Sequence, residues 1–471
     1  MILKTDPQEI SPYLQDASNY LGGFAEKVVI PESTEELSSF LKNNTKPITI
    51  AGAGTGMTAS RIPESGYVIS LERFDSISNL DNDIIDVGPA VSLFKLYEKL
   101  ESTDYFYPPN PTESLASIGG TVATNASGSR SYKFGVTRDY ILEADIVLPN
   151  GNFICLKRGL SIQNPLKISN GLELFFPNVS YISPMCKNAA GYYVRPNMDW
   201  LDLFIGSEGT LGIFTRIRLK LELKPSSFIS GILFFQNDEE CWGLVDSIKK
   251  SNQNFIKPCS LEYFDCHSLN RLRRKFANIP FNAKSALFFE NDVNREIDYE
   301  PTLEAWFDFL KDTNVLSDSW FAQSYNDLKR FHEFRHALPA LLNEENSRLN
   351  RTKIGTDMAV PDEYFFDMLV FYKNELEKVG IDYVVFGHLG DNHLHINFLP
   401  EEQETKRAHK IYSKLVTQIL KWGGTVSAEH GIGKLKKKYF AQMAGVQSLD
   451  QLKSIKKIFD PNFILGKGNI F

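Results

Sequence analysis

The sequence predicts an α+β protein of two domains, one over residues 1–223 and one over residues 224–471. Three observations predict this fold class. The chain starts with a strand, helix and strand pattern, it continues in short β-like runs separated by Gly, Pro, Asn and Ser clusters, and its composition changes after Leu223. With 471 residues, 42% of them hydrophobic, the chain is long enough to build more than one core.

The first domain begins with apolar residues at 28–30, a Pro-Glu-Ser-Thr helix opening and helix over 31–43, and an apolar run at 48–50. Later runs such as YVISL and ADIVLP are typical of strands. Residues 157–185 lack a regular pattern, so we expect them to form an inserted loop.

The second domain combines strands with amphipathic helices. The runs FISGILFF and SALFFE predict strands, while the apolar periodicity predicts helices over 236–251, 301–312 and 361–379. The chain shows neither internal repeats nor low-complexity tracts.

Composition excludes several classes of protein. A net charge of -7 argues against nucleic-acid binding, which needs clustered Lys and Arg. No apolar stretch approaches the roughly 18 residues of a membrane span, and MILKTDPQEI lacks the apolar core of a secretion signal, so we expect a cytoplasmic protein. The five cysteines never form a CxxC pair, which argues against structural zinc, iron–sulfur clusters and a disulfide framework.

The first glycine-rich segment is AGAGTGM, directly after the apolar run at 48–50. Gly52, Gly54 and Gly56 allow backbone N–H groups to approach a phosphate closely. A dinucleotide-binding turn is a competing interpretation, but only ten residues separate Gly56 from the strand at Tyr67, too few for a crossover helix. A plain tight turn remains the structural alternative.

Two further segments are rich in small residues. Within 107–140, nearly every residue from 114 to 129 is small, as a backbone lying flat against an extended cofactor would require. A mobile Gly/Ser loop is the alternative, although the interleaved Ile118 and Val122 favour an ordered segment. The third segment, 202–221, passes through three glycines into an alternating strand and could be only a hairpin.

In this order the three segments resemble the flavin-binding half of the vanillyl-alcohol oxidase superfamily, the p-cresol methylhydroxylase (PCMH) type of FAD fold. The resemblance covers almost the whole chain. It implies a two-part FAD-binding domain, then an α+β substrate (cap) domain whose C-terminal segment returns to the flavin. It further implies that residues 52–56 hold the pyrophosphate, that 114–128 follow the ribityl chain and ring, and that 206–213 close over the adenine side.

The cofactor contacts implied by this resemblance are Gly52, Ala53, Gly54, Thr55, Gly56, Met57, Pro108, Ser114, Ser117, Gly119, Gly120, Thr124, Asn125, Ser127, Gly128, Glu208, Gly209, Gly212 and Ile213. Neither the phosphate loop nor segment 107–140 contains a His or Cys for a covalent link, so we expect dissociable FAD. The family's usual C-terminal Leu-Asn-Pro-Gly-Lys is replaced by a tail with Leu465, Gly466 and Lys467, so no flavin contact is assigned there.

Five of the eight histidines lie between His388 and His430. The segment VVFGHLGDNHLHINF predicts a β-hairpin with turn residues at 390–392. A turn centred between residues 391 and 392 would place His388 directly opposite His395, with Cβ atoms about 4.5–5.5 Å apart. Two imidazoles in this arrangement can bind one metal ion.

The segment GGTVSAEHGIG adds a carboxylate and an imidazole in a glycine-flanked bend. Glu429 can complete a two-His, one-carboxylate set and leave His430 free. Such a set suits zinc, with manganese or iron as alternatives. An isolated histidine is more often a hydrogen-bonded buried or surface residue, the interpretation we keep for His393 and His409.

These two segments resemble the C-terminal half of the metal-dependent 2-hydroxy-acid branch of the same superfamily. By that resemblance His388, His395 and Glu429 bind the metal, Asn397 contacts the substrate and His430 is the base. The family usually has Gly and Asn where this chain has Asn392 and His393.

The implied chemistry is oxidation of a small 2-hydroxy acid to its 2-oxo acid, with the metal chelating the substrate and hydride passing to FAD. Arg335 matches the cation that the family commonly uses on the far side of the substrate, and Lys353 is a second candidate, two residues before the family's lysine position at Gly355. The alternative for each is a surface cation or a salt bridge.

Two other functions remain open from the sequence. One is a metal-free FAD oxidase of an alcohol or sugar that uses oxygen. The other is a flavin subunit of a membrane-associated electron-transfer complex, which would need a partner because the chain has no iron–sulfur motif. For the hydroxy-acid dehydrogenase, the electron acceptor would be a quinone, a cytochrome or an electron-transfer flavoprotein, and a homodimer is allowed.

Overall fold

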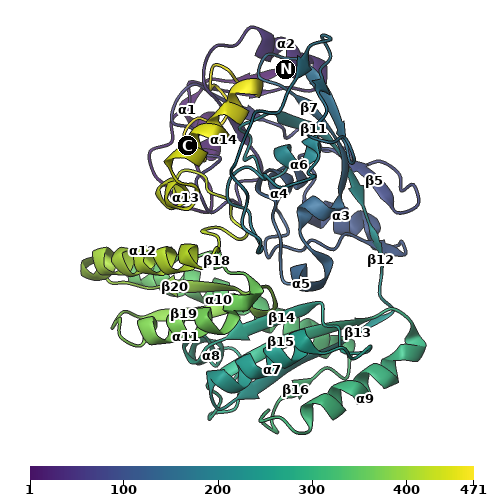
Figure 1. The fold of residues 1–471 in the computed structure, drawn as a ribbon, viewed down its shortest axis with the longest axis vertical. Helices are drawn as coiled ribbons and strands as arrows, with labels where there is room; N and C mark the ends of the chain where they lie inside the picture. Colours follow the sequence, from purple (N-terminus) through teal and green to yellow (C-terminus); the bar gives the residue numbers. More distant parts are fainter.

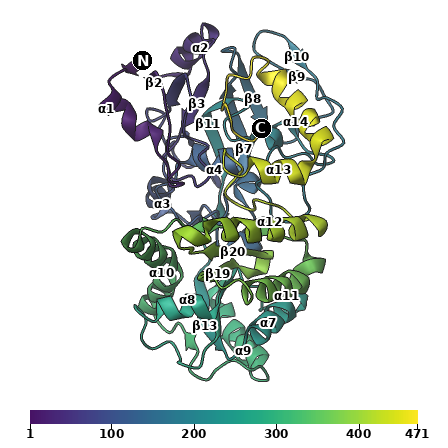
Figure 2. The same cartoon turned by 90° about the vertical axis from the view of Figure 1, so that its left-hand side faces the viewer.

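The computed structural model describes all 471 residues and has two lobes, one above the other in Figure 1. The N-terminal lobe contains residues 1–223 and the last helices of the chain, and the C-terminal lobe contains most of the residues between them (Figure 2). The predicted α+β class is therefore confirmed. No helix combines the length and the apolar character that a bilayer span requires.

The first sheet has the strand order β1-β2-β4-β3. Its strands are β1 (Ile2–Lys4), β2 (Lys27–Ile30), β4 (Tyr67–Ser70) and β3 (Ile48–Ala51). Helix α2 (Thr34–Lys42) connects the parallel strands β2 and β3, as predicted, and Ser33 caps it by accepting the N–H of Glu36 at 3.2 Å. Residues 52–66, between β3 and β4, contain no helix, so a loop leaves the carboxyl end of β3.

The second sheet is antiparallel, in the order β5-β11-β7-β8. Its strands are β5 (Ile84–Val87), β11 (Ile213–Lys220), β7 (Ile141–Val147) and β8 (Phe153–Lys157). Strand β11 alternates buried and partly exposed residues after Thr215, as one covered face requires. Shorter elements complete the lobe: α1 (Pro7–Ile10), α3 (Leu93–Leu100), β6 (Tyr105–Phe106), α5 (Ser131–Phe134), β9 (Leu166–Lys167), β10 (Glu173–Leu174), α6 (Trp200–Phe204) and β12 (Glu222–Leu223).

Part of the small-residue segment, which we expected to lie flat against a cofactor, forms a helix. Helix α4 (Ile118–Thr124) begins where the Ser117 hydroxyl accepts the N–H of Gly120, and it ends at Asn125 in the left-handed conformation, with φ 49°. Ile118 and Val122 are four residues apart, so they share one buried face of the helix. The two caps and this apolar pair outweigh the low helix propensity of two glycines.

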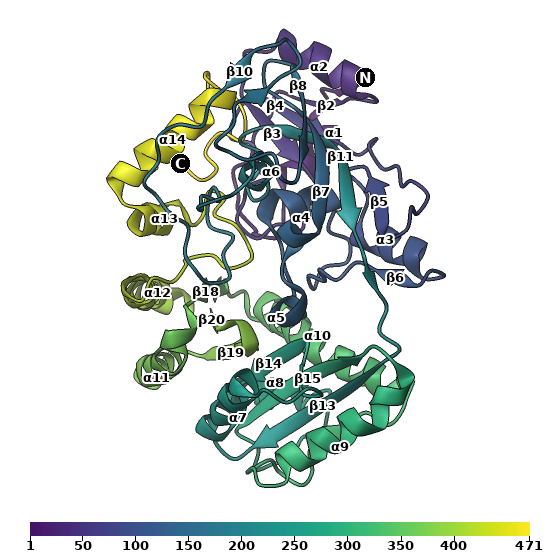
Figure 3. The same cartoon turned by 45° about the vertical axis from the view of Figure 1, so that its right-hand side comes forward.

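The C-terminal lobe is built on an eight-stranded sheet in the order β16-β13-β15-β14-β19-β20-β17, with β18 paired to β20. The strands are β16 (Trp320–Phe321), β13 (Ser227–Phe235), β15 (Ser285–Val293), β14 (Ser260–Phe264), β19 (Tyr383–His388), β20 (His393–Phe398), β17 (Ile354–Gly355) and β18 (Met358–Ala359). The chain enters this lobe by running from β12 into β13 (Figure 1), which lies beside α9 in Figure 3.

Helices cover both faces of this sheet. They are α7 (Asp238–Lys250), α8 (Cys266–Leu272), α9 (Tyr299–Leu310), α10 (Tyr325–Leu349), α11 (Phe365–Leu376) and α12 (Thr405–Lys421). Ile232 and Phe234 of β13 pack into the apolar cluster formed with α8 and α10, whereas Leu233 and Phe235 belong to the cluster that includes α7, α9 and α11. Because both faces are buried, the strand reads as a continuous apolar run.

The C-terminal segment returns to the N-terminal lobe through α13 (Lys437–Ala444) and α14 (Val446–Phe459) (Figure 2). The ring of Phe459 lies 4.9 Å from that of Phe204. Beyond α14, Leu465 forms a parallel bridge with Ile48 of β3, and the N–H of Gly466 donates to the carbonyl of Ile48. The tail therefore extends the first sheet beside the glycine-rich loop.

Asp265 gives a prediction for stability. Its carboxylate caps α8 by accepting the N–H of Ser268 at 2.8 Å, and burial raises its pKa to about 7. A carboxyl group with a raised pKa stabilises the fold fully below its unfolded pKa, and this contribution is lost as the pH rises through about 7. We expect Asp265→Asn, which keeps the cap, to raise the melting temperature at about pH 8 and to change it little at about pH 4. Thermal scans at both pH values measure this; equal shifts would contradict it.

Candidate active site

A cleft of about 1860 Å³ lies between the glycine-rich loops and the histidine-bearing strands. It is larger than the roughly 300–1,000 Å³ of an ordinary small-molecule site, so it has room for a dinucleotide and a small substrate together. Ion pairs join the lobes beside it: Nε of Arg130 lies 3.1 Å from Oε2 of Glu290, and Nζ of Lys133 lies 2.6 Å from Oδ1 of Asp292.

The loop after β3 forms one wall of the cleft. Gly54 adopts φ +83°, a conformation that favours glycine. A Cβ atom on Gly52 would lie 3.0 Å from the hydroxyl of Ser117, whereas a Cβ on Gly56 would meet nothing closer than 4.0 Å. The loop therefore packs on the start of α4 at one glycine and leaves open space beside another.

Most residues with a predicted cofactor contact line this cleft: Gly52, Ala53, Gly54, Thr55, Gly56, Met57, Ser117, Gly119, Gly120, Thr124, Ser127, Gly128, Glu208, Gly209, Gly212 and Ile213. Pro108, Ser114 and Asn125 do not. The Asn125 side chain accepts the N–H of Arg138 at 2.9 Å, and Pro108 is buried. Asn125 therefore ends α4 rather than facing the cleft.

Glu208 faces the cleft, but protein groups already occupy its carboxylate. The oxygens accept the N–H groups of Ile432 and Gly433 at 2.7 Å each, and the Ser60 hydroxyl at 2.6 Å. Burial raises the pKa of this carboxyl. Glu208 therefore fixes the bend after His430 to the N-terminal lobe.

The histidine hairpin forms as predicted, but the predicted register is wrong. Phe386 of β19 is paired with His395 of β20, so the centre of the turn lies one residue earlier than expected and His388 is not the partner of His395. Asn392 takes the left-handed conformation, with φ 54°, and ends this turn. His388 and His395 still share one face of the hairpin as diagonal neighbours, with ring centroids 5.8 Å apart.

The bend that carries Glu429 and His430 is held by Asp357, whose carboxylate accepts the N–H of Glu429 at 3.2 Å and that of His430 at 2.9 Å. Lys436 and Ser427 also contact this carboxylate, at 2.7 and 2.6 Å. These contacts bring the Glu429 carboxylate beside the hairpin, where Oε2 lies 3.3 Å from Nε2 of His388.

His388 and His395 each have one ring nitrogen that donates a hydrogen bond to an acceptor in the protein. Nδ1 of His388 donates to Oε1 of Glu262 at 2.6 Å, and Nδ1 of His395 donates to the carbonyl of Thr356 at 3.2 Å. Acceptors of this kind orient the imidazoles of metal sites and leave the other nitrogen for the ion. Together with Glu429, ligand atoms of His388, His393 and His395 lie within 4.8 Å of one another.

The electrostatics of this cluster favour a cation. Burial alone would lower the pKa of His388, but Glu262 and Glu429 raise it to about 9. Burial likewise opposes ionisation of Glu429, yet His388 and Lys187 hold its pKa well below its usual range. A buried proton held between two carboxylates marks a position that a divalent ion can take, so the donor set fits a metal.

Lys187, which the sequence analysis did not identify, also contacts Glu429. Its ammonium is 2.7 Å from Oε1 of Glu429 and 3.2 Å from Oδ2 of Asp391. The Ser127 hydroxyl donates to the same Glu429 oxygen at 2.7 Å. The N-terminal lobe therefore orients this carboxylate through one of its oxygens.

The remaining predicted site residues also line the cleft, but their contacts with the rest of the protein differ. They are Arg335, Lys353 and Asn397. The guanidinium of Arg335 is buried and donates from Nε to Oε2 of Glu262 at 3.3 Å. Lys353 forms no ion pair, and burial lowers its pKa. Asn397 lies on β20 opposite Gly355. Lys353 is therefore a free cation facing the cleft, whereas Arg335 supports the acidic partner of His388.

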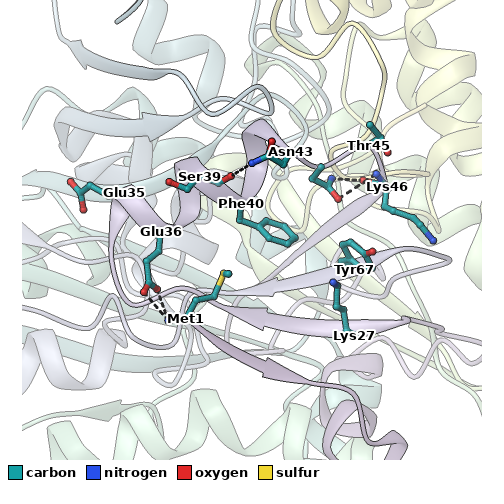
Figure 4. A pocket seen from close by; sticks show the side chains of 11 residues that line it. Met1, Lys27, Glu35, Glu36, Ser39, Phe40, Asn43, Thr45, Lys46 and Tyr67 are labelled. Carbon is teal, nitrogen blue, oxygen red and sulfur yellow. Dashed lines mark hydrogen bonds and ion pairs between the residues drawn. The ribbon is translucent and has the colours of Figure 1, made fainter.

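A second hollow, of about 710 Å³, lies far from the histidines, beside α2 and strands β2 and β4 (Figure 4). The amino terminus of Met1 lies 2.7 Å from Glu36, and Lys46 lies 2.8 Å from Glu26. These charges neutralise one another, so the hollow offers no set of groups converging on a ligand.

Comparison with known protein families identifies the family of this chain. The model of the FAD-linked oxidase C-terminal domain matches residues 224–470, and that of an FAD-binding domain matches residues 25–157. The chain belongs to the FAD-linked oxidases. This FAD-linked oxidoreductase accordingly combines a PCMH-type flavin-binding part with the family's C-terminal part.

Curated relatives match along nearly the entire oxidase chain. Glycolate oxidase subunit GlcD of Bacillus subtilis is 29% identical, over 98% of this chain and 92% of that protein. D-lactate dehydrogenase of Anaerostipes hadrus is 29% identical, over 94% and 89%. D-2-hydroxyglutarate dehydrogenase of Stutzerimonas stutzeri is 24% identical, over 99% and 95%.

A solved structure of alkyldihydroxyacetonephosphate synthase matches 98% of this chain and 81% of its own, with a TM-score of 0.68 and 15% identity. The oxidase therefore shares this fold.

Proposed function

We propose that this FAD-linked oxidoreductase oxidises a small D-2-hydroxy acid, such as lactate or glycolate, to the 2-oxo acid and passes electrons to an acceptor other than oxygen. One observation carries the proposal: a single cleft is lined by glycine-rich loops on one side and by the imidazole and carboxylate cluster on the other. The names of the similar proteins, which specify glycolate, D-lactate and D-2-hydroxyglutarate, support this substrate class.

In this proposal residues 1–223 bind FAD and residues 224–471 provide the substrate side. The loop at 52–57 and the start of α4 accommodate the cofactor through backbone groups. Neither the phosphate loop nor segment 107–140 contains a His or Cys, which supports a dissociable flavin. When bound, FAD would accept a hydride, and a divalent metal held by His388, His395 and Glu429 would hold the carboxylate and hydroxyl oxygens of the substrate.

His430 is the base in this scheme. Its side chain is 28% exposed, compared with 7% for His388 and 12% for His395, so it is the most exposed histidine of the cluster. Burial lowers its pKa, which keeps the ring neutral and able to take the hydroxyl proton near neutral pH. Nδ1 lies 3.4 Å from Oδ2 of Asp357, which leaves Nε2 free to act.

Zinc suits the proposed ligand set, with manganese or iron as alternatives. Asn397 is placed to hydrogen-bond the substrate, since it lines the cleft on the same strand as His395. Lys353 is the cation available for a substrate carboxylate because Arg335 is paired with Glu262.

Lys353→Met should raise the KM of the substrate by roughly 10- to 100-fold with a smaller effect on kcat, because a charge-assisted hydrogen bond contributes about 1.5–3 kcal/mol. Steady-state kinetics with an artificial electron acceptor measure both constants. Lys438→Met, in the same cleft but paired with the Tyr439 ring, is the matched control and should leave KM unchanged. An unchanged KM in the Lys353 variant would exclude this binding role.

The proposed function is tested by anaerobic mixing of the purified, metal-replete yellow protein with D- and L-lactate, glycolate, malate and 2-hydroxyglutarate. We expect one or more D-configured or achiral hydroxy acids to bleach the flavin absorbance at a rate at least as fast as turnover. If none of these acids reduces the flavin, the proposed activity is wrong.

A further inference from the structure

His393 is a buried histidine whose ring has no adequate partner. It is 0% exposed, and neither of its ring nitrogens makes a well-aligned hydrogen bond. Buried polar groups of folded proteins are almost always paired, and an orphan costs about 1–3 kcal/mol. A buried polar group without a hydrogen-bond partner indicates either local strain or contact with a ligand. A buried imidazole without a partner therefore indicates that an additional group contacts this ring.

The position of His393 identifies that group. It is the first residue of β20 and lies two residues before His395, so the two side chains share one face of the strand. Its ring centroid is 5.2 Å from that of His388 and 4.5 Å from that of His395. It also belongs to the set of ligand atoms, completed by Glu429, that lie within 4.8 Å of one another.

One nitrogen of His393 lies beside a carboxylate. Nε2 is 3.0 Å from Oδ1 of Asp357 but is not aligned as a hydrogen bond, whereas His388 is hydrogen-bonded to Glu262 and His395 to the carbonyl of Thr356. Nδ1 has no hydrogen-bond partner. An imidazole with one nitrogen beside a carboxylate and the other unpaired resembles the arrangement of a metal ligand.

We propose that His393 is a fourth protein ligand, so that three imidazoles and Glu429 hold the divalent ion. The inference rests on the proposed function only in that it assumes a metal at His388, His395 and Glu429. Atoms bonded to one ion at about 2.0–2.2 Å lie no more than about 4.4 Å apart, so small side-chain movements bring the four donors to these distances. A metal that accepts six ligands, such as manganese or iron, would still have room for the two oxygens of a hydroxy acid.

The test compares His393→Asn with the wild type in two measurements that do not depend on turnover. Zn²⁺ affinity is measured by competition with a chromophoric chelator, and the number of bound imidazoles is counted by pulsed EPR of the Cu²⁺-loaded protein. We expect the variant to bind Zn²⁺ roughly 100-fold more weakly and to show one imidazole fewer. His409→Asn, a cleft histidine outside the cluster, should change neither.

Flavin content and melting temperature show whether the Asn variant is folded, and His393→Gln provides a second substitution if it is not. If the wild type binds one ion through two imidazoles and the variant binds it equally well, His393 is not a ligand, and the proposed function is unaffected. If the wild type binds no divalent ion at all, the metal site of the proposed function fails instead.

Discussion

Replacing His430 with Asn is expected to lower the rate of flavin reduction by roughly 10²- to 10⁴-fold, the range typical for loss of a general base. The expected cause is specific to proton transfer. His430 is the most exposed histidine of the cluster, and its backbone N–H is fixed by Asp357 whether or not the ring is present. The bend should therefore keep its shape, and Glu429 its position, in the variant.

Anaerobic stopped-flow reduction of the flavin measures this rate directly, and metal and flavin contents are determined on the same samples. His409→Asn serves as the matched control, with an expected rate near that of the wild type. Because burial lowers the pKa of His430, the wild-type rate should fall in acid, with an apparent pKa below the ordinary range of histidine. A variant that reduces the flavin at the wild-type rate would remove His430 from the mechanism.

Local patterns were sufficient to predict much of the fold. Apolar runs bounded by turn residues located β2, β4, β13 and β15, and amphipathic periodicity located α7, α9 and α11. Helix α10 was not predicted, because Pro339 lies inside it and a proline normally interrupts a helix. Its buried face, with Phe334 and Leu338 against the sheet, outweighs the lost hydrogen bond.

Most of the predicted site residues lie in one cleft, but the contacts that support them could not be predicted from the sequence. Glu262, Asp357 and Lys187 come from elements far from the histidines in the chain, and no local motif marks them. The predicted register of the hairpin was wrong for another reason. Gly, Asp and Asn all tolerate turn positions, so three adjacent turn residues do not specify where the turn is centred.

Glu429→Gln is expected to reduce metal affinity strongly and to lower turnover by at least roughly 1000-fold, since a metal that stabilises the reacting oxygens contributes several kcal/mol. The substitution preserves shape and keeps an oxygen for the donors Ser127 and Lys187, which contact Oε1 at 2.7 Å each. It removes the negative charge next to His388, and with it much of the attraction for a cation.

Metal binding to the wild type should also depend on pH. Glu262 and Glu429 raise the pKa of His388 to about 9 despite its burial, so an incoming ion must displace a proton from this ring. Affinity should therefore increase with pH, by up to about tenfold per unit, and level off near pH 9. In Glu429→Gln the His388 pKa falls, so the affinity should be lower throughout and level off at a lower pH. Calorimetric titration with Zn²⁺ at several pH values distinguishes these curves, and an affinity independent of pH would show that His388 does not bind the ion.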